Sequence, residues 1–288
     1  MIRDIPQDKP LTSDRAEART DRIAVSREAP ETSLLSREHL AVRDRGYIYR
    51  LSPAGLETMY DIGQFRTVAI EDLAQRRYRD QATLMQQDLR ALRAQGLVEL
   101  RTVWTGPKSK ELRVAVLTKV GKALLERHGQ NTKDQALYAG FVKPAEVRHD
   151  AAIYRMFQAE RQKIERAGGQ IRRVVLDYEL KRNVYSPLAK VKALPPAEYA
   201  KRQREVAQAN GLRVVHGKIP LPDLRIEYQT REGETARVDL ELATHHYHGS
   251  HLQAKAEAGF KFYAADGAAS RLSRVMEDRE ITAVILSL

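Results

Sequence analysis

Three acidic residues near the end of the chain have types and spacings that suit metal-assisted chemistry. Asp223 follows a proline at the start of one strand-like run, and Asp239 and Glu241 lie in the next. Side chains alternate along a strand, so Asp239 and Glu241 share one face, and a neighbouring strand beginning at Asp223 brings its carboxylate beside Glu241. Mg²⁺ or Mn²⁺ prefers oxygen ligands and keeps several waters, so two or three carboxylates suffice. The pattern predicts a metal-dependent active site, and the alternative is plain acidic decoration of a hairpin edge.

A cluster of histidines follows these acids directly. His245, His246, His248 and His251 make up half of the eight histidines in the chain. His248 is a further candidate ligand for the cation. His248 and His251 would alternatively flank a zinc ion, although a third ligand must then come from elsewhere. Partly protonated imidazoles beside DNA phosphates are a simpler interpretation.

Two other histidine patterns carry hypotheses. The run His246-Tyr247-His248 resembles the His-hydrophobic-His motif of relaxases and rolling-circle initiators. That resemblance implies a metal held by two imidazoles and a helical tyrosine, here Tyr263, that attacks a DNA phosphate and forms a covalent link. Separately, His149 and Asp150 stand at the head of a helix, either as a buried structural pair or as members of the site.

The elements before residue 130 are helical and end in a hairpin. Helices are predicted over 52–63, 67–78 and 81–96, with Ser52 as an N-cap and Gly96 as a C-terminal cap. A hairpin with the polar tip GPKSK and a further helix follow. Residues 46–128 thus resemble a winged helix-turn-helix, which implies that the third helix enters the major groove of DNA. The residues then expected to contact DNA are Arg79, Gln81, Thr83, Gln86, Gln87 and Arg90 of that helix and Lys108 and Lys110 of the wing tip.

The second half of the chain has the order helix, strand, strand, strand, helix, strand. The helix is predicted from residue 147, the first strand over 171–180, one helix within the basic stretch 181–218, two further strands around a turn at Gly233, a helix over 248–266 and a final strand. This order, with Asp223 and Glu241, resembles the PD-(D/E)XK nucleases. The lysine of that motif should stand two residues after the glutamate, where this chain has Ala243. Lys255 is the best-placed substitute and Lys261 the second.

A narrower resemblance joins the two halves. A basic winged helix followed by VRHD at a helix start, then Pro222-Asp223 and a strand ending in Glu241, is similar to the replication-relaxation family of plasmids and mobile elements. The resemblance implies a role in DNA replication, mobilisation or processing and a nuclease-like second domain. Its helical lysine and tyrosine would be Lys255 and Tyr263 here.

Composition points to an anionic partner. The formal net charge is +11 and the pI is near 9.8, so double-stranded DNA is expected before any membrane. Residues 161–218 hold 14 lysines and arginines against 5 aspartates and glutamates. Within that stretch, a phosphate path is predicted along Arg172, Arg173, Lys181 and Arg182. The chain has no cysteine, no long apolar run and no signal-peptide core, so we expect a cytoplasmic, nucleoid- or plasmid-associated protein.

The sequence therefore predicts an α+β protein: a flexible arm over 1–35, a winged helix-turn-helix over 46–128, a linker over 129–144 and a PD-(D/E)XK-like domain with a central mixed sheet over 145–288. As an enzyme it would be a DNA endonuclease with Asp223, Glu241 and Lys255 as catalytic residues. A non-catalytic regulator or replication accessory factor, with a second domain that serves homodimerisation or protein contacts, is the competing interpretation. The tyrosine transferase is a third.

Overall fold

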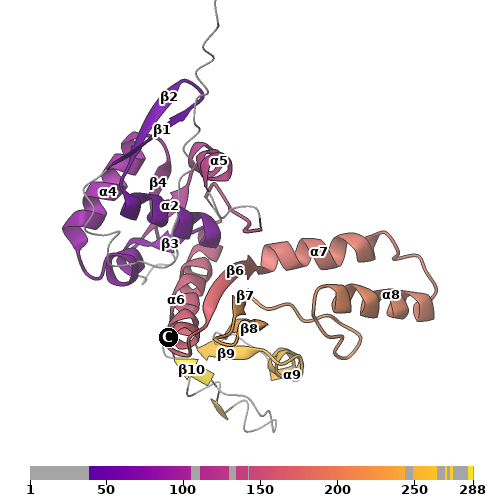
Figure 1. The fold of residues 1–288 in the computed structure, drawn as a ribbon. Helices are drawn as coiled ribbons and strands as arrows, with labels where there is room; N and C mark the ends of the chain where they lie inside the picture. Colours follow the sequence, from indigo (N-terminus) through magenta and orange to yellow (C-terminus); the bar gives the residue numbers. More distant parts are fainter. Residues whose placement is uncertain are drawn as a thin grey trace, which may run out of the picture.

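The chain folds as an α+β protein, and its described residues form helices and three β-sheets (Figure 1). The computed structural model describes residues 39–104, 111–129, 134–141, 143–243, 249–264, 270, 273–274 and 285–287. The predicted arm over residues 1–35, the wing-tip residues Lys108 and Lys110, and His245, His246 and His248 lie outside the described residues.

The amino-terminal part, residues 40–128, is called the helical region here. It begins with a two-stranded antiparallel hairpin and continues with helices around a small three-stranded sheet of order β3-β5-β4. Its elements in chain order are β1 (Leu40–Asp44), β2 (Tyr47–Leu51), α2 (Pro53–Phe65), β3 (Val68–Ala69), α3 (Ile70–Asp72), the π-helical turn η1 (Leu73–Arg77), α4 (Ala82–Ala94), β4 (Val98–Val103), β5 (Leu112–Leu117) and α5 (Lys119–His128).

Local signals explain where these helices begin and end. The Ser52 hydroxyl accepts a hydrogen bond from the Gly55 amide at 2.9 Å, which caps α2 as predicted. Thr118 caps α5 in the same way. Helix α4 buries Met85, Leu89 and Leu92 on one face, and Gly96, with φ of 68°, takes the left-handed conformation that ends it.

The part from residue 144 onward is called the sheet region. Its elements are α6 (Pro144–Arg166), β6 (Gln170–Leu176), α7 (Asp177–Ala189), α8 (Pro196–Ala209), β7 (Leu224–Gln229), β8 (Thr235–Ala243), α9 (Gly249–Glu257), β9 (Lys261–Ala264) and β10 (Ile285–Ser287). The five strands form one mixed sheet of order β10-β9-β8-β7-β6. Strands β6, β7 and β8 are antiparallel neighbours, whereas β9 runs parallel to β8 and β10 parallel to β9. The mixed sheet that the sequence predicts is thus present.

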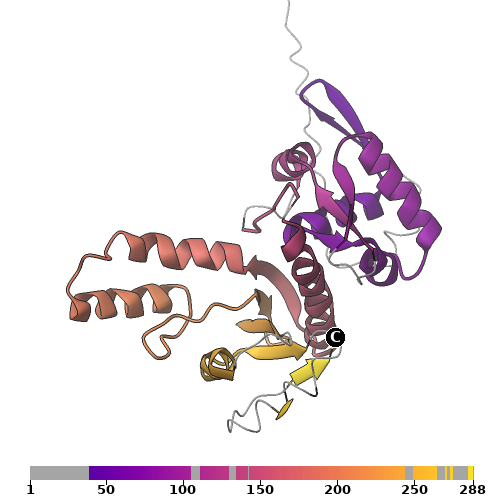
Figure 2. The same cartoon turned by 180° about the vertical axis from the view of Figure 1, so that it is seen from behind.

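Helix α6 joins the two regions into one packed body. It has 23 residues, so it is about 35 Å long, and both views place it between the helical region and the sheet (Figures 1 and 2). Tyr154 and Phe157 of α6 pack against Phe65 of α2, with ring centroids 5.2 and 4.8 Å apart. One hydrophobic core runs from α2 through α6 to Leu240 and Leu242 of β8.

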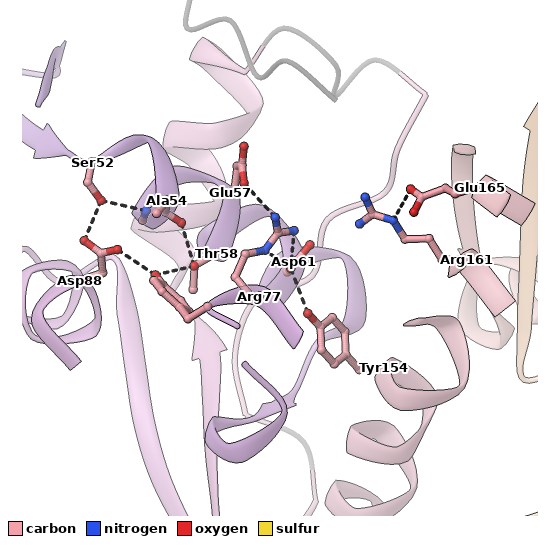
Figure 3. Close-up of polar contacts among 12 residues, drawn as sticks. Ser52, Ala54, Glu57, Thr58, Asp61, Arg77, Asp88, Tyr154, Arg161 and Glu165 are labelled. Atoms are coloured by element: carbon pink, nitrogen blue, oxygen red, sulfur yellow. Dashed lines mark hydrogen bonds and ion pairs between the residues drawn. The ribbon is translucent and has the colours of Figure 1, made fainter. Parts of the chain in front are cut away.

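Buried polar bonds reinforce this junction (Figure 3). Arg77 of η1 donates to Asp61 of α2 at 2.8 Å and to Glu57 at 2.8 Å. The same Asp61 accepts from the Tyr154 hydroxyl of α6 at 3.1 Å. Because breaking a buried ion pair is costly, this network holds α2, η1 and α6 in a fixed arrangement.

Three predicted elements are wrong. The strand expected over 171–180 ends at Leu176, and the chain continues as α7, so the basic stretch contains two helices instead of one. The helix expected over 248–266 ends at Glu257, and Tyr263 lies on strand β9. The helix expected over 67–78 is divided into β3, α3 and η1. Gly259, with φ of 89°, ends the helix expected over 248–266. In the other two cases pairing or packing with distant residues overrides the local pattern.

The described part of the predicted linker, residues 134–141, is packed and not loose. The side-chain amide of Gln135 donates to the Val174 carbonyl at 2.8 Å and accepts from its N–H at 2.9 Å. The Tyr138 amide donates to the Gly63 carbonyl at 2.8 Å. This segment therefore bonds to β6 of the sheet region and to α2 of the helical region. None of the described helices is long and apolar enough to cross a membrane.

Candidate active site

Asp223 and Glu241 lie at the same end of two neighbouring antiparallel strands. Asp223 precedes β7, and Glu241 is near the end of β8. The Asp223 Oδ2 atom accepts a hydrogen bond from the Leu242 amide at 3.0 Å, so this carboxylate is turned toward β8. The adjacent Leu240 and Leu242 are buried in the core that contains α6. The structure thus brings the two predicted carboxylates to one edge of the sheet.

Lys255 completes this arrangement from α9. Its ammonium donates to Glu241 Oε1 in a short hydrogen bond, and the Glu241 side chain is only 1% exposed. A buried carboxylate requires such a partner, because an unpaired charge in this position is strongly unfavourable. The positive charge that neutralises Glu241 therefore comes from Lys255, on the helix that follows β8 in the chain.

His149 of α6 lies between Asp223 and its own neighbour Asp150. The His149 Nε2 atom lies 3.5 Å from Asp223 Oδ2, and its Nδ1 atom lies 3.7 Å from Asp150 Oδ1. Burial opposes protonation of this imidazole, but the two carboxylates outweigh burial and raise the pKa of His149 to about 10. Burial would raise the pKa of Asp223, but His149, Lys255 and the Leu242 amide lower it. Both groups are therefore charged at neutral pH.

The helical region contributes one residue to this cluster. Arg66, at the end of α2 with φ of 64°, places its NH1 atom 3.6 Å from Asp150 Oδ2. Its guanidinium also stacks on the Tyr178 ring of α7 at 3.7 Å from the centroid. Charged groups thus extend from α2 through Asp150 and His149 to Asp223. Tertiary packing holds Arg66 in the left-handed conformation, which is unusual for a residue other than glycine. No local sequence pattern predicts this conformation.

Asp239 has a different environment from Glu241, although both stand on one strand. Arg225 donates to both Asp239 oxygens, at 2.7 and 2.9 Å. The Arg225 side chain is 4% exposed and also donates to the carbonyl oxygens of Asn210 and Gly211. A bidentate ion pair with a buried arginine is a structural arrangement. It favours Asp239 as a residue that fixes β7, β8 and the end of α8, and not as a cation ligand.

A cavity of about 690 Å³ opens beside Asp223 and Lys255. The walls come from α7, α8, α9 and the segment before β7, and His251 of α9 also lines it. Exposed or half-buried lysines contribute to these walls, namely Lys181, Lys192, Lys218 and Lys255. This cavity was not predicted from the sequence because α7, one of the helices that form it, was not recognised as helical.

The residues predicted for the phosphate path are partly engaged in internal bonds. Arg172 donates to Gln229 and Arg173 to Glu179, each in a short hydrogen bond. Lys181 donates to Asp177 at one turn's distance along α7, and Arg182 is exposed. Lys181 lines the cavity, whereas the two arginines stand on β6. The basic surface nearest the acids is therefore formed by α7 and the segment before β7.

The predicted DNA-contacting residues at or on α4 share one property: each is exposed. The opposite face of α4 is fixed to α2 by a buried network in which Asp88 accepts from Ser52 at 2.6 Å and from Tyr78 at 2.9 Å (Figure 3). A rigidly held helix with an outward face of amides and arginines suits contacts with phosphates and base edges. The exposed residues are Arg79, Gln81, Thr83, Gln86, Gln87 and Arg90.

Tyr263 does not suit the role of a nucleophile. It is 1% exposed on β9, its hydroxyl donates to Glu160 at 2.7 Å and it accepts from Lys163 at 2.8 Å. Burial and Glu160 raise the pKa of this phenol. A tyrosine that attacks DNA must reach the phosphate and lose its proton, and this environment opposes both. Without Tyr263, the tyrosine transferase hypothesis rests only on the histidines that lie outside the described residues.

The donor set at the sheet edge fits a hard divalent cation in chemical type. Asp223 and Glu241 would hold Mg²⁺ or Mn²⁺ through oxygen atoms, as such cations prefer. Across the part of the chain that the structure describes, no group of three or more His, Cys, Asp or Glu side chains is arranged to hold a metal ion. Waters and a substrate phosphate would therefore have to supply the remaining ligands.

No protein-family model, curated protein or solved structure matches this chain.

Proposed function

We propose that this chain is a DNA-binding protein that cuts or processes DNA at the site formed by Asp223, Glu241 and Lys255. The observation that carries the proposal is the position of these three side chains, from the residue before β7, from β8 and from α9, beside a lysine-lined cavity. A carboxylate with a shifted pKa beside a cavity, as at Asp223, is a frequent feature of active sites. The net charge of +11 suits a nucleic-acid substrate.

The class that this proposal names is a winged-helix protein with a PD-(D/E)XK-type nuclease domain. Two features support it. The first is the order α2, β3, α3, η1, α4, β4, β5 with the sheet order β3-β5-β4. The second is the order α6, β6, β7, β8, α9, β9 around a mixed sheet, with the helices α7 and α8 inserted between β6 and β7. Within that class, the resemblance to the replication-relaxation proteins suggests a role in plasmid or mobile-element replication, mobilisation or processing.

Each residue has a role that its geometry allows. Asp223 and Glu241 would hold the divalent cation, which when bound offsets phosphate charge and lowers the pKa of a bound water. Lys255 would orient the attacking water or stabilise the developing charge on the phosphate oxygen. His149, protonated at neutral pH, adds positive charge beside Asp223. The exposed face of α4 would hold the duplex.

A non-catalytic DNA-binding regulator is the second candidate. Glu241 is buried and already neutralised by Lys255, which is also the arrangement expected of a purely structural ion pair. In that case α4 and the basic cavity would bind DNA, and the second domain would serve oligomerisation or contacts with other proteins.

A plasmid-cleavage assay tests the proposal. Supercoiled DNA is incubated with the protein and Mg²⁺ or Mn²⁺, with a chelator in the parallel reaction. We expect nicked or linear product that the chelator abolishes and that Asp223→Asn and Glu241→Gln both lose. Glu227→Gln on β7 of the same sheet, whose side chain is 33% exposed, is the matched control and should cut at the wild-type rate. If the protein binds DNA with a steep dependence on salt but does not cleave it with either metal, the nuclease proposal is wrong and the non-catalytic regulator is favoured.

A further inference from the structure

The pair of helices α7 and α8 is an insertion between β6 and β7 that creates the cavity. Both views show the pair projecting from the sheet edge (Figures 1 and 2). It has its own apolar core, in which Val184 and Leu188 of α7 pack with Val206 of α8 and Leu221. An insertion with its own core has a fixed shape, so the cavity beside Asp223 is a built feature of the fold.

The charge of the cavity suits an anionic ligand. Four lysines line it against the two carboxylates Asp177 and Asp223. Lys181 is bound to Asp177 and Lys255 to Glu241, so the exposed Lys192 and Lys218 leave a positive balance at the rim. A phosphate backbone entering there would be attracted toward Asp223 and Lys255.

The cavity is also aromatic and apolar, which a duplex backbone alone would not require. Tyr185 of α7 is 53% exposed, Tyr199 of α8 is half-buried, and Leu188 and Leu221 form part of the lining. Exposed tyrosines within a basic groove are the means by which proteins stack unpaired bases. Bases inside a duplex are already stacked and cannot reach such a pocket. The volume of about 690 Å³ lies within the range of about 300–1,000 Å³ that holds a small organic ligand.

We propose that this cavity binds unpaired nucleotides of single-stranded DNA and leads the strand to the Asp223–Lys255 edge. The inference deepens the proposed function and rests on it for the identity of the reacting site. The substrate class is then DNA that has a duplex segment for α4 and a single-stranded segment for the α7–α8 cavity, as at a junction, flap or unwound origin.

The test is fluorescence anisotropy of a labelled ten-nucleotide oligothymidylate with the full-length protein in the presence of a chelator. We expect the wild type to bind, and Tyr185→Ala to weaken binding about tenfold through the loss of one stacking contact. Tyr185→Phe keeps the ring and should bind like the wild type. Tyr47→Ala, which removes a 69% exposed tyrosine from β2, is the matched control and should also bind normally.

Two results would overturn the inference. The first is an absence of oligothymidylate binding by the wild-type protein at low salt. The second is an equal affinity of Tyr185→Ala and Tyr47→Ala. Binding is measured without a divalent cation, so this result is independent of cleavage. Failure of the proposed function would instead show in the plasmid assay, where Glu241→Gln keeps Tyr185 and the cavity lysines unchanged.

Discussion

Two clusters of carboxylates and cationic side chains in the sheet region can be compared. The difference between them indicates which cluster is structural and which is a candidate active site. The acid site contains Asp223, Glu241, Lys255 and His149. The Glu160 cluster contains Glu160 and Lys163 of α6 with Lys261 and Tyr263 of β9. Both use α6, and both contain a nearly fully buried glutamate bound to a lysine. Charge and burial alone therefore do not distinguish them.

What distinguishes them is the space beside the charges. Both oxygens of Glu160 accept a direct hydrogen bond, from Lys261 and from Tyr263, each at 2.7 Å. No member of the Glu160 cluster lines the cavity between α7, α8 and α9, whereas Asp223 and Lys255 both do. A saturated cluster holds helix to strand, but a cluster that borders a basic cavity can meet a substrate.

Lys255→Met gives the largest expected effect. We expect cleavage of supercoiled DNA to fall by about 10³-fold, roughly 4 kcal/mol of transition-state stabilisation. The matched control is Lys261→Met, which removes a lysine from the Glu160 cluster and should leave the rate within about twofold. Rates are measured at a temperature where circular dichroism shows each variant folded. Equal losses of cleavage rate in Lys255→Met and Lys261→Met would contradict the proposed difference between the two clusters.

Glu160→Ala tests the structural cluster. The change leaves the buried Tyr263 hydroxyl without its acceptor and removes the partner of Lys261, so we expect the free energy of unfolding to fall by about 3 kcal/mol. Urea denaturation measures this loss. At temperatures where the variant is folded, its cleavage rate should equal that of the wild type. A stable variant with impaired cleavage would place Glu160 in the chemistry instead.

Tyr263→Phe has a smaller effect on stability. Removing the hydroxyl deletes its bonds to Glu160 and Lys163 and should cost about 1 kcal/mol. We expect no change in DNA cleavage and no covalent protein–DNA product in either the wild type or the variant, as judged by denaturing gels. A covalent product that disappears in Tyr263→Phe would instead support the tyrosine transferase.

The dependence of stability on pH gives the smallest effect. Burial would raise the pKa of Glu160, but Lys261, Tyr263 and Lys163 together lower it below 4.5. A group with a lowered folded pKa contributes stability above its unfolded pKa and loses it as pH falls through the folded value. The stability difference between wild type and Glu160→Gln should therefore be full at pH 7 and shrink below about pH 4.5. Unfolding at a series of pH values measures it.

The order of elements was predictable from the sequence where local patterns are strong. The alternation in β7 and β8 around Gly233 and the apolar stripe of α4 both predicted the observed structure. Strand β3 has only two residues and is defined by its pairing with β5, so no local sequence pattern could predict it. Gly259, with φ of 89°, ends α9 before Tyr263, but the strand that holds Tyr263 is defined by pairing with β8.

The candidate site was partly predictable for the same reason. Asp223 directly precedes β7 and Glu241 lies on β8, and the sequence pattern predicts both strands and Lys255 as the best-placed lysine. The contacts of His149 with Asp223 and of Arg66 with Asp150 depend on how α6 and α2 pack. Asp239 shares a strand with Glu241, yet Arg225 neutralises it. The role of each carboxylate depends on the partner that tertiary packing places beside it. The spacing of residues in the sequence does not predict that partner.

Mn²⁺ binding followed by electron paramagnetic resonance tests most directly whether Asp223 and Glu241 act on a cation together. Free Mn²⁺ gives a strong signal that decreases as the ion binds protein. We predict one bound ion per chain for the wild type and for Glu160→Gln, and loss of that ion in both Asp223→Asn and Glu241→Gln. Undiminished Mn²⁺ binding by both acid-site variants would contradict the account.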